Sequence, residues 1–330
     1  MGNCMDPNFK DKKITAVQLF GDAKSRSGTC VSCVLKRKNG SLLVTSVKEG
    51  KDTYYQLNSS GESTVLILED PPKTDNMFHM LEYEGYLLMF KTKFYLTKDG
   101  KALFESPEKC KAKYSYGHNL NQGRGVQIIG SSLYFQTKSS NLIEYDLAVL
   151  LKSADKSKLQ GKIVYDEEVE DFCIGGDKAV FILTLDGGIS QIANQKAVKT
   201  FQADNLQRGS QFSTIETCGS NLVTCGFSPK RNAKFYMVMS RDLKEVSMCE
   251  VQGIHGGVHS LLTHSTADYV HILAACAFKS VDWLVFTNNA LILIDSVEVT
   301  GRELYGLAWK EEGVEAIVYG EKEQMKSFKL

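Results

Sequence analysis

Short runs of hydrophobic residues recur along the whole chain, and glycine, asparagine, aspartate or serine separates one run from the next. In the segment 126–166, for example, turns at Gly130-Ser-Ser and Lys138-Ser-Ser-Asn separate three apolar runs. Such intervals are typical of β-strands joined by hairpins. Helical periodicity is limited to residues 147–160, where we expect a helical turn. The pattern therefore predicts an all-β protein.

The pattern of strands and turns repeats along the sequence. Residues 126–166 and 169–201 each predict a meander of four antiparallel strands. The first strands of successive units begin near residues 30, 77, 126, 169, 212, 258 and 304. A four-stranded unit of about 40–50 residues is the sequence mark of a β-propeller blade. Seven such starts predict a seven-bladed β-propeller of four-stranded antiparallel blades.

The two ends of the repeat complement each other. The last unit ends after three strands, whereas an additional strand at residues 14–20 precedes the first unit. We expect this N-terminal strand to complete blade seven and close the ring, which also covers an exposed sheet edge. The result is one domain at 14–330 behind a flexible segment at 1–13. Two β-sandwiches are the alternative fold, although no linker divides the chain.

One unit carries sequence features of a known family. Its third strand ends in Leu142-Ile-Glu-Tyr145-Asp146-Leu, where Tyr-Asp stands in the place of Trp-Asp, and Gly117-His118 precedes its first strand. In these features the chain resembles a divergent WD40-like β-propeller. The other units mostly lack both features. The resemblance implies a ring that binds through its loops, and it identifies no individual partner.

Composition argues against some functions and indicates a cellular compartment. Lys plus Arg and Asp plus Glu both number 39, so we expect no nucleic-acid partner, which would need a basic surplus. Nine cysteines without an apolar leader predict free thiols in the cytoplasm. No apolar run is long enough for a transmembrane helix. Gly2 and Cys4 are candidate acylation sites, although Asp6 stands where the myristoylation pattern has Ser or Thr. A frayed terminus is the alternative.

Candidate catalytic groups are sparse. Nucleophile-elbow, phosphate-loop and zinc-protease motifs are absent. Cys30 and Cys33 fall on a predicted strand, where residues three apart point to opposite faces and cannot easily share a zinc ion. On the inner strands we find only Glu82, Glu216 and His259. We therefore expect no enzyme activity, metal, cofactor or small-molecule substrate, with a hydrolase or lyase in the central channel as an alternative.

Basic residues gather in the turns that we expect on one face of the ring. This face carries the connections between blades and the turns from second to third strands. The longest connection, 105–125, interleaves cations with aromatic residues, and long loops of this composition are often binding sites. The candidate partner-binding residues are Lys109, Lys111, Lys113, Tyr114, Tyr116, His118 and Arg124 in this connection, and Lys91, Lys93, Lys138, Lys230, Arg231 and Lys279 in the turns.

An acidic connection, residues 166–171, should lie beside the basic one and partly neutralise it. The sequence thus favours a non-catalytic protein-interaction platform, a subunit of a larger intracellular assembly that binds an acidic segment of a partner. A cytoskeletal polymer and a trafficking or ubiquitin-type complex are all compatible. The alternative is peripheral binding to an anionic membrane through the basic turns and an acylated N-terminus.

Overall fold

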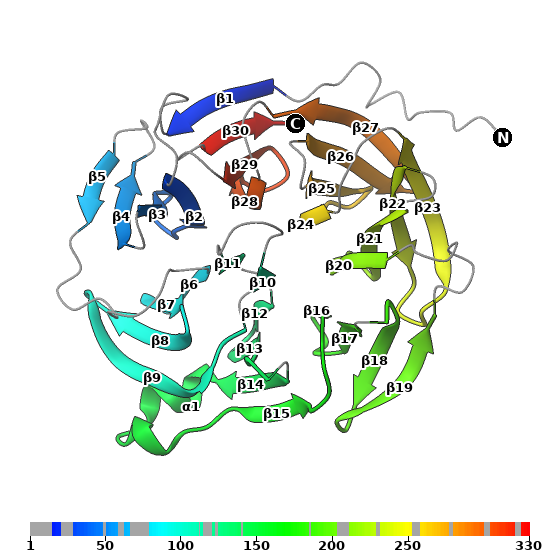
Figure 1. Cartoon of the computed structure of the whole chain (residues 1–330). Coiled ribbons are helices and arrows are strands. Elements are labelled where there is room, and N and C mark those ends of the chain that lie inside the picture. Colours follow the sequence, from blue (N-terminus) through cyan, green and yellow to red (C-terminus); the bar gives the residue numbers. More distant parts are fainter. Residues whose placement is uncertain are drawn as a thin grey trace.

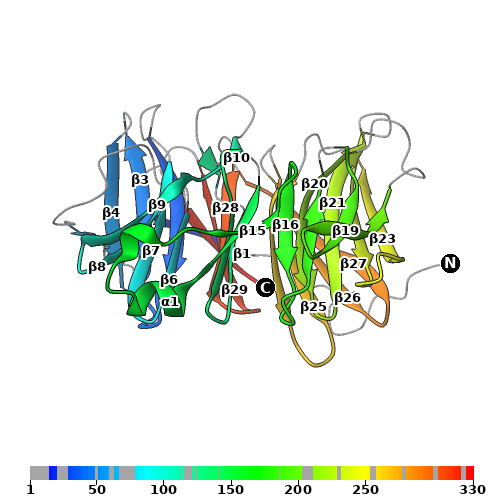
Figure 2. The same ribbon diagram turned by 90° about the horizontal axis from the view of Figure 1, so that it is seen from below.

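Among the residues that the structure describes, seven four-stranded antiparallel sheets stand in a ring in this computed structural model (Figure 1). The described residues are 15–20, 29–48, 51–58, 63–66, 79–111, 113–114, 121–122, 125–139, 141–184, 186–202, 211–228, 232–252, 258–276, 280–299, 304–320 and 325–330. In side view the connections between strands lie on the two faces of the ring (Figure 2). The protein is a seven-bladed β-propeller, as the repeat predicts.

In each blade the strands run from the centre of the ring outward. Blades one to four consist of β2 (Thr29–Lys36), β3 (Leu42–Lys48), β4 (Lys51–Leu57), β5 (Ser63–Leu66); β6 (His79–Tyr83), β7 (Tyr86–Phe90), β8 (Lys93–Lys98), β9 (Lys101–Lys109); β12 (Val126–Ile129), β13 (Ser132–Gln136), β14 (Leu142–Asp146), β15 (Lys162–Tyr165); and β16 (Asp171–Ile174), β17 (Val180–Leu183), β18 (Ile189–Ala193), β19 (Lys196–Phe201). Blades five to seven consist of β20 (Gln211–Cys218), β21 (Asn221–Ser228), β22 (Ala233–Met239), β23 (Glu245–Gln252); β24 (Val258–Ser265), β25 (Val270–Cys276), β26 (Ser280–Thr287), β27 (Ala290–Glu298); and β28 (Leu304–Glu311), β29 (Glu315–Gly320), β30 (Met325–Lys329), β1 (Thr15–Phe20). The observed first strands begin within about two residues of the predicted starts.

The ring closes through its two ends. β1 pairs antiparallel with β30, with Ala16 opposite Phe328, and becomes the outermost strand of blade seven. This confirms the predicted closure by the N-terminal strand. The division into a flexible segment at 1–13 and one domain at 14–330 stays a prediction, because residues 1–14 lie outside the described part of the chain.

Short elements lie between the blades. β10 (Lys113–Tyr114) and β11 (Asn121–Gln122) form a hairpin, and α1 (Leu147–Lys152) and the 3-10 turn η2 (Lys156–Lys158) lie between β14 and β15. The Asp146 carboxylate caps α1 by accepting the amide of Ala148 at 2.9 Å. The helical turn expected at 147–160 thus covers two short pieces. No helix in the described ranges is long and apolar enough to cross a membrane.

The middle strands explain why the sequence shows apolar runs rather than strict alternation. Every residue of β13, β17, β22 and β25 is buried, because both faces of a middle strand pack against neighbouring blades. The outermost strand β19, in contrast, is exposed along nearly its whole length. Burial therefore falls from the inner part of each blade toward the rim.

The hydrophobic core is divided among the seams between blades. In the described part of the chain, buried hydrophobic side chains form seven clusters, one at each seam. The cluster between blades two and three is rich in aromatic rings: Phe94 and Tyr145 contact each other, and each of them contacts both Phe104 and Phe135. Neighbouring blades are thus held together mainly by apolar burial.

Candidate interaction site

The connection from blade two to blade three begins as ordered backbone. β9 continues to Lys109, so residues 105–109 of the predicted long loop are part of a strand. Beyond it, the Cys110 amide donates to the Thr92 carbonyl at 2.8 Å, and the Lys111 amide donates to the Gln136 carbonyl at 2.9 Å. Cys110 also forms a β-bridge with Thr137. The chain therefore crosses from blade two to blade three along a fixed path.

Two of the predicted binding residues lie side by side on this path. The Lys138 amide donates to the Lys109 carbonyl at 2.6 Å, and both lysines are exposed. They line a groove of about 650 Å³ between Glu108 at the end of β9 and the start of β15. The other lining residues are Glu108, Thr137, Ser139, Asn141, Ile143, Gln160, Gly161 and Ile163. The groove combines two ammonium groups with polar side chains and an exposed apolar residue, Ile163 (39% exposed).

Glu108 links this site to blade three through hydrogen bonds. Its carboxylate accepts the Tyr145 hydroxyl at 2.5 Å and the Gly161 amide at 3.0 Å. Burial, and then the hydrogen bond to Glu108, raise the pKa of Tyr145 well above its usual range, so the phenol stays protonated and remains a donor. A Cβ at Gly161 would lie 2.7 Å from Ile143 Cδ1, so this close approach requires glycine.

Lys111 has a different role from Lys109. Its Nζ donates to the Val169 carbonyl at 3.0 Å, and the Gln136 side-chain amide donates to the same oxygen at 3.2 Å. Val169 belongs to the acidic connection 166–171, so the two connections do meet. In the same connection, Asp166 accepts the Asn141 amide at 2.5 Å.

The basic turn of blade two is less exposed than the sequence predicts. Lys91 is only 4% exposed, so its placement on an open basic face is wrong. The connection passes this turn, where the Cys110 amide donates to the Thr92 carbonyl. Lys93 is partly exposed and forms an ion pair with Glu105 at 2.5 Å.

The remaining candidates fall where side chains are not described. Lys113 and Tyr114 form β10, whose backbone pairs with β11 on one face of the ring (Figure 2). The candidates outside the described residues are Gly2, Cys4, Tyr116, His118, Arg124, Lys230, Arg231 and Lys279. Their assignment to partner binding or acylation stays a prediction.

The two inner-strand glutamates considered for the channel accept hydrogen bonds, one from a neighbouring blade and one from the adjacent residue. Glu82 accepts the Lys38 amide of blade one at 3.2 Å, and Glu216 accepts the amide of its neighbour Thr217 at 2.8 Å. The His259 side chain lies outside the described set. Among described residues, no group of three or more His, Cys, Asp or Glu side chains is placed to hold a metal ion.

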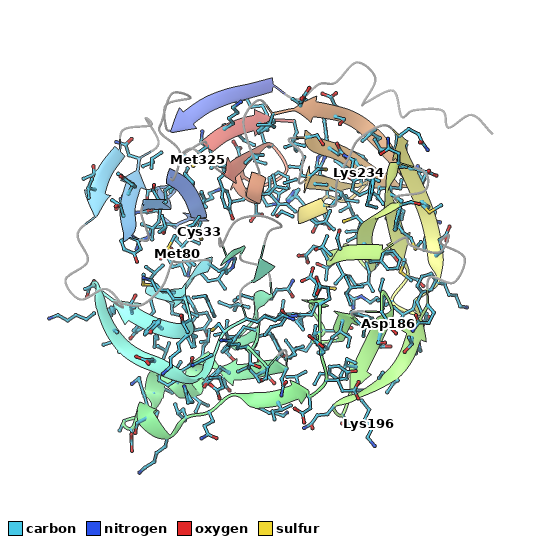
Figure 3. All side chains as sticks on the ribbon, viewed as in Figure 1. Cys33, Met80, Asp186, Lys196, Lys234 and Met325 are labelled. Carbon is cyan, nitrogen blue, oxygen red and sulfur yellow. The ribbon has the colours of Figure 1, made fainter. Side chains whose placement is uncertain are left out.

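Sequence reasoning missed a buried charge pair between blades five and six. Lys234 Nζ lies 2.5 Å from Asp282 Oδ2, and both side chains are fully buried. Lys234 is labelled in Figure 3. Tyr236 and Ser296 donate hydroxyl hydrogen bonds to the same carboxylate at 2.5 and 2.7 Å. The available signal was a charged residue within an otherwise apolar run, as in Ala233-Lys-Phe-Tyr-Met-Val-Met.

The comparisons with known proteins find similarity in three-dimensional structure and none in sequence. No protein-family model matches it, and no curated protein matches it significantly. A chain in the crystal structure of BBS1N in complex with ARL6DN, soaked with mercury, is similar with a TM-score of 0.65 over 97% of this chain and 98% of that one, at 11% identity. A chain in the crystal structure of the Mitotic Checkpoint Complex has a TM-score of 0.65 over 99% of this chain and 96% of that one, at 12% identity. These likenesses show the β-propeller fold.

Proposed function

We propose that this propeller is a non-catalytic interaction platform within a larger intracellular assembly, and that it binds an acidic segment of a protein partner. The observation that carries the proposal is the fixed, exposed pair Lys109 and Lys138 beside the groove of blade three. Both structural neighbours come from structures of protein complexes. This supports a protein partner for this chain.

The geometry suits recognition of carboxylates next to an apolar residue. Each exposed ion pair contributes only about 0–1 kcal/mol, so two lysines provide orientation and steering more than affinity. A hydrophobic side chain of the partner that packs on Ile163 would bury apolar area and so contribute affinity that the exposed ion pairs do not supply. An acidic segment with a neighbouring hydrophobic side chain therefore fits the groove best.

Cytoplasmic residence belongs to the same proposal. The seven cysteines with described side chains form no disulfide, and six of them are buried. Burial raises the pKa of Cys110, Cys173 and Cys218, which keeps these thiols protonated and unreactive. Free, unreactive thiols fit a reducing compartment.

Charge reversal at the lysine pair tests the proposal. The variant is Lys109→Glu with Lys138→Glu, and the control is Lys196→Glu with Lys244→Glu, which changes two exposed lysines elsewhere by the same total charge. Lys196 lies on the outer rim (Figure 3). Quantitative pull-downs identify the partners, and calorimetry with the purified partner measures affinity.

We expect at least about a tenfold loss of affinity in the variant, none in the control, and weaker wild-type binding as ionic strength rises. An unchanged affinity in the variant would refute this site. Flotation with anionic vesicles separates the alternative, since vesicle binding lost only in the variant would indicate a membrane-surface function.

A further inference from the structure

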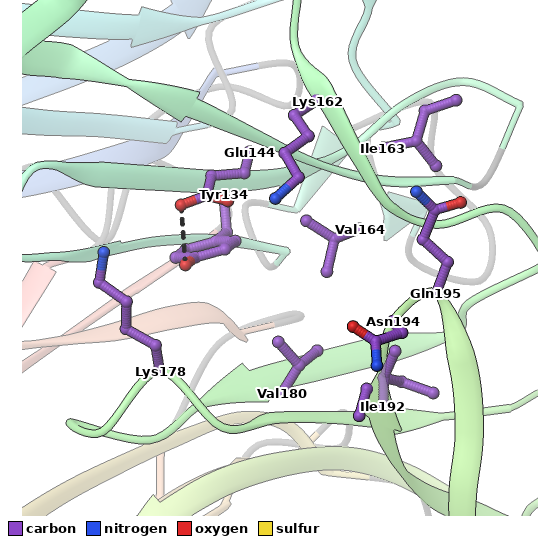
Figure 4. A pocket seen from close by; sticks show the side chains of 11 residues that line it. Tyr134, Glu144, Lys162, Ile163, Val164, Lys178, Val180, Ile192, Asn194 and Gln195 are labelled. Carbon is purple, nitrogen blue, oxygen red and sulfur yellow. Dashed lines mark hydrogen bonds between the residues drawn. The ribbon is translucent and has the colours of Figure 1, made fainter.

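A second groove opens at the seam between blades three and four, and it shares only Ile163 with the groove beside Lys109 and Lys138. Its volume is about 470 Å³ (Figure 4). One wall comes from β13, β14 and β15, and the other from β17, β18 and the turns beside them. Val164, Val180 and Ile192 line it and also belong to the hydrophobic cluster of this seam. The groove is therefore a place where the apolar seam reaches the surface.

Two lysines approach the groove from opposite walls. Lys162 lies on β15 of blade three, and Lys178 precedes β17 of blade four (Figure 4). Lys178 Nζ donates to the uncharged hydroxyl of Ser132 at 2.9 Å. Glu144 lies opposite Lys162 in the sheet and accepts the Tyr134 hydroxyl at 3.1 Å. Two ammonium groups thus face one carboxylate, which leaves a positive surplus that one acidic group would balance.

Two strained backbone positions hold polar side chains at this groove. Lys178 has φ 65° and Gln195 has φ 64°, both in the left-handed region. For residues other than glycine, asparagine and aspartate this conformation costs roughly 1–2 kcal/mol. A glycine would serve either turn with less strain. Gln195 is the second residue of the two-residue turn between β18 and β19, and such hairpin turns use left-handed φ values. The two turns place an ammonium and an amide beside an apolar surface.

We propose that this groove binds a short extended peptide of a partner protein, in which an apolar side chain lies next to an aspartate or glutamate. The apolar side chain would contact Val164, Val180 and Ile192, and the carboxylate would lie near Lys178. The side-chain amides of Asn194 and Gln195 line the same groove and can donate to and accept from a peptide backbone. This mixture of apolar wall and few polar groups is typical of recognition sites.

The test uses capped synthetic peptides in an alanine–serine background, each with one leucine and one glutamate at varied separation and order. A matched set carries lysine in place of glutamate. Binding is measured by fluorescence polarisation, and methyl NMR follows Ile192 and Val164. We expect leucine–glutamate peptides to bind at least about tenfold more tightly than leucine–lysine peptides and to shift these methyl signals.

Two pairs of variants localise the binding. Ala193 is exposed and lines the groove, so Ala193→Trp should fill it, whereas Ala197→Trp changes an exposed alanine outside the groove. Lys178→Glu removes the charge match, with Lys196→Glu as its control. We expect about a tenfold or greater loss in Ala193→Trp and Lys178→Glu and less than about a twofold change in the controls.

Several results would overturn the proposal. They are binding by none of the peptides, equal binding of both peptide sets, or full binding by Ala193→Trp and Lys178→Glu. Binding of a short-chain fatty acid without peptide binding would assign the groove to a small amphiphile instead. The variant Lys109→Glu with Lys138→Glu should still bind the peptides, so failure at this groove is distinguishable from failure of the proposed function.

Discussion

The hydroxyl of Tyr145 donates a hydrogen bond to the carboxylate of Glu108 across the seam between blades two and three, at 2.5 Å. Glu108 is the second-last residue of the outer strand of blade two, directly before Lys109, and Tyr145 of blade three lies in the aromatic cluster between the two blades. The hydrogen bond therefore joins the core of one blade to the edge of the proposed binding site on the other. A partly buried carboxylate that loses such a donor is left incompletely satisfied.

We expect Tyr145→Phe to lower the free energy of unfolding by about 1–3 kcal/mol, because the Gly161 amide is then the one donor to the Glu108 carboxylate among the described residues. Urea unfolding measures the change. Tyr165→Phe is the matched control, since its hydroxyl bonds to exposed Glu167 at 2.8 Å and should contribute less than about 1 kcal/mol. Equal losses in the two variants would contradict a special role for the Glu108 contact.

Closure of the ring by β1 gives a second prediction. Removal of all residues before residue 21 takes away β1 and exposes the edge of β30. Unpaired edges favour association with other strands, so this truncated protein should melt at lower temperature and form oligomers. Calorimetry and size-exclusion chromatography with light scattering measure both effects. Removal of residues 1–13 alone keeps β1 and should change neither; equal effects of the two truncations would refute closure by this strand.

The fold was predictable because its signals are local. Turn residues mark each hairpin, and Gly130 and Gly219 occupy turns with φ near 60°, where glycine is favoured. The buried middle strands appear directly as apolar runs. Blade starts at 126, 258 and 304 are therefore predicted to the residue, and the others to within about two.

The site was only partly predictable because it depends on contacts between distant residues. The sequence predicts Lys91 and Lys111 as surface cations, yet Lys91 is buried and Lys111 donates a hydrogen bond to Val169 of the next connection. Glu108 and Tyr145 are 37 residues apart, and no local pattern relates them. Lysine type and turn position do not determine exposure when another segment passes over the turn.

The buried pair Lys234 and Asp282 provides a third prediction. Burial alone would lower the pKa of Lys234, but the facing Cys276 and Asp282 groups outweigh it and raise that pKa, so the ammonium is retained. Removing one partner of a buried pair leaves an uncompensated charge and typically costs about 3–5 kcal/mol. We therefore expect Asp282→Asn and Lys234→Met each to be strongly destabilising in urea unfolding.

The double variant distinguishes charge pairing from simple packing. When both charges are removed, neither is left unpaired, so the loss should be smaller than the sum of the two single losses by roughly 1–3 kcal/mol. Tyr236 and Ser296 donate to different oxygens of Asp282, so in Asp282→Asn one hydroxyl keeps the amide oxygen as its acceptor and the other faces the amide NH2 group. Additive losses in the double-mutant cycle would mean that the pair contributes only through volume.

The last prediction concerns pH and His79, a partly buried residue of β6 whose ring lies 6.1 Å from that of Phe90. Burial lowers the pKa of His79 from 6.5 to about 4. Between these values the unfolded chain binds a proton that the folded chain does not, so stability is full above pH 6.5 and falls as the pH drops toward 4. We expect the wild type to lose roughly 1–2 kcal/mol more than His79→Gln between pH 7 and pH 5, measured by urea unfolding at each pH. The glutamine variant has no proton to bind at this position, so an identical pH dependence in the two proteins would show that other groups account for the acid sensitivity.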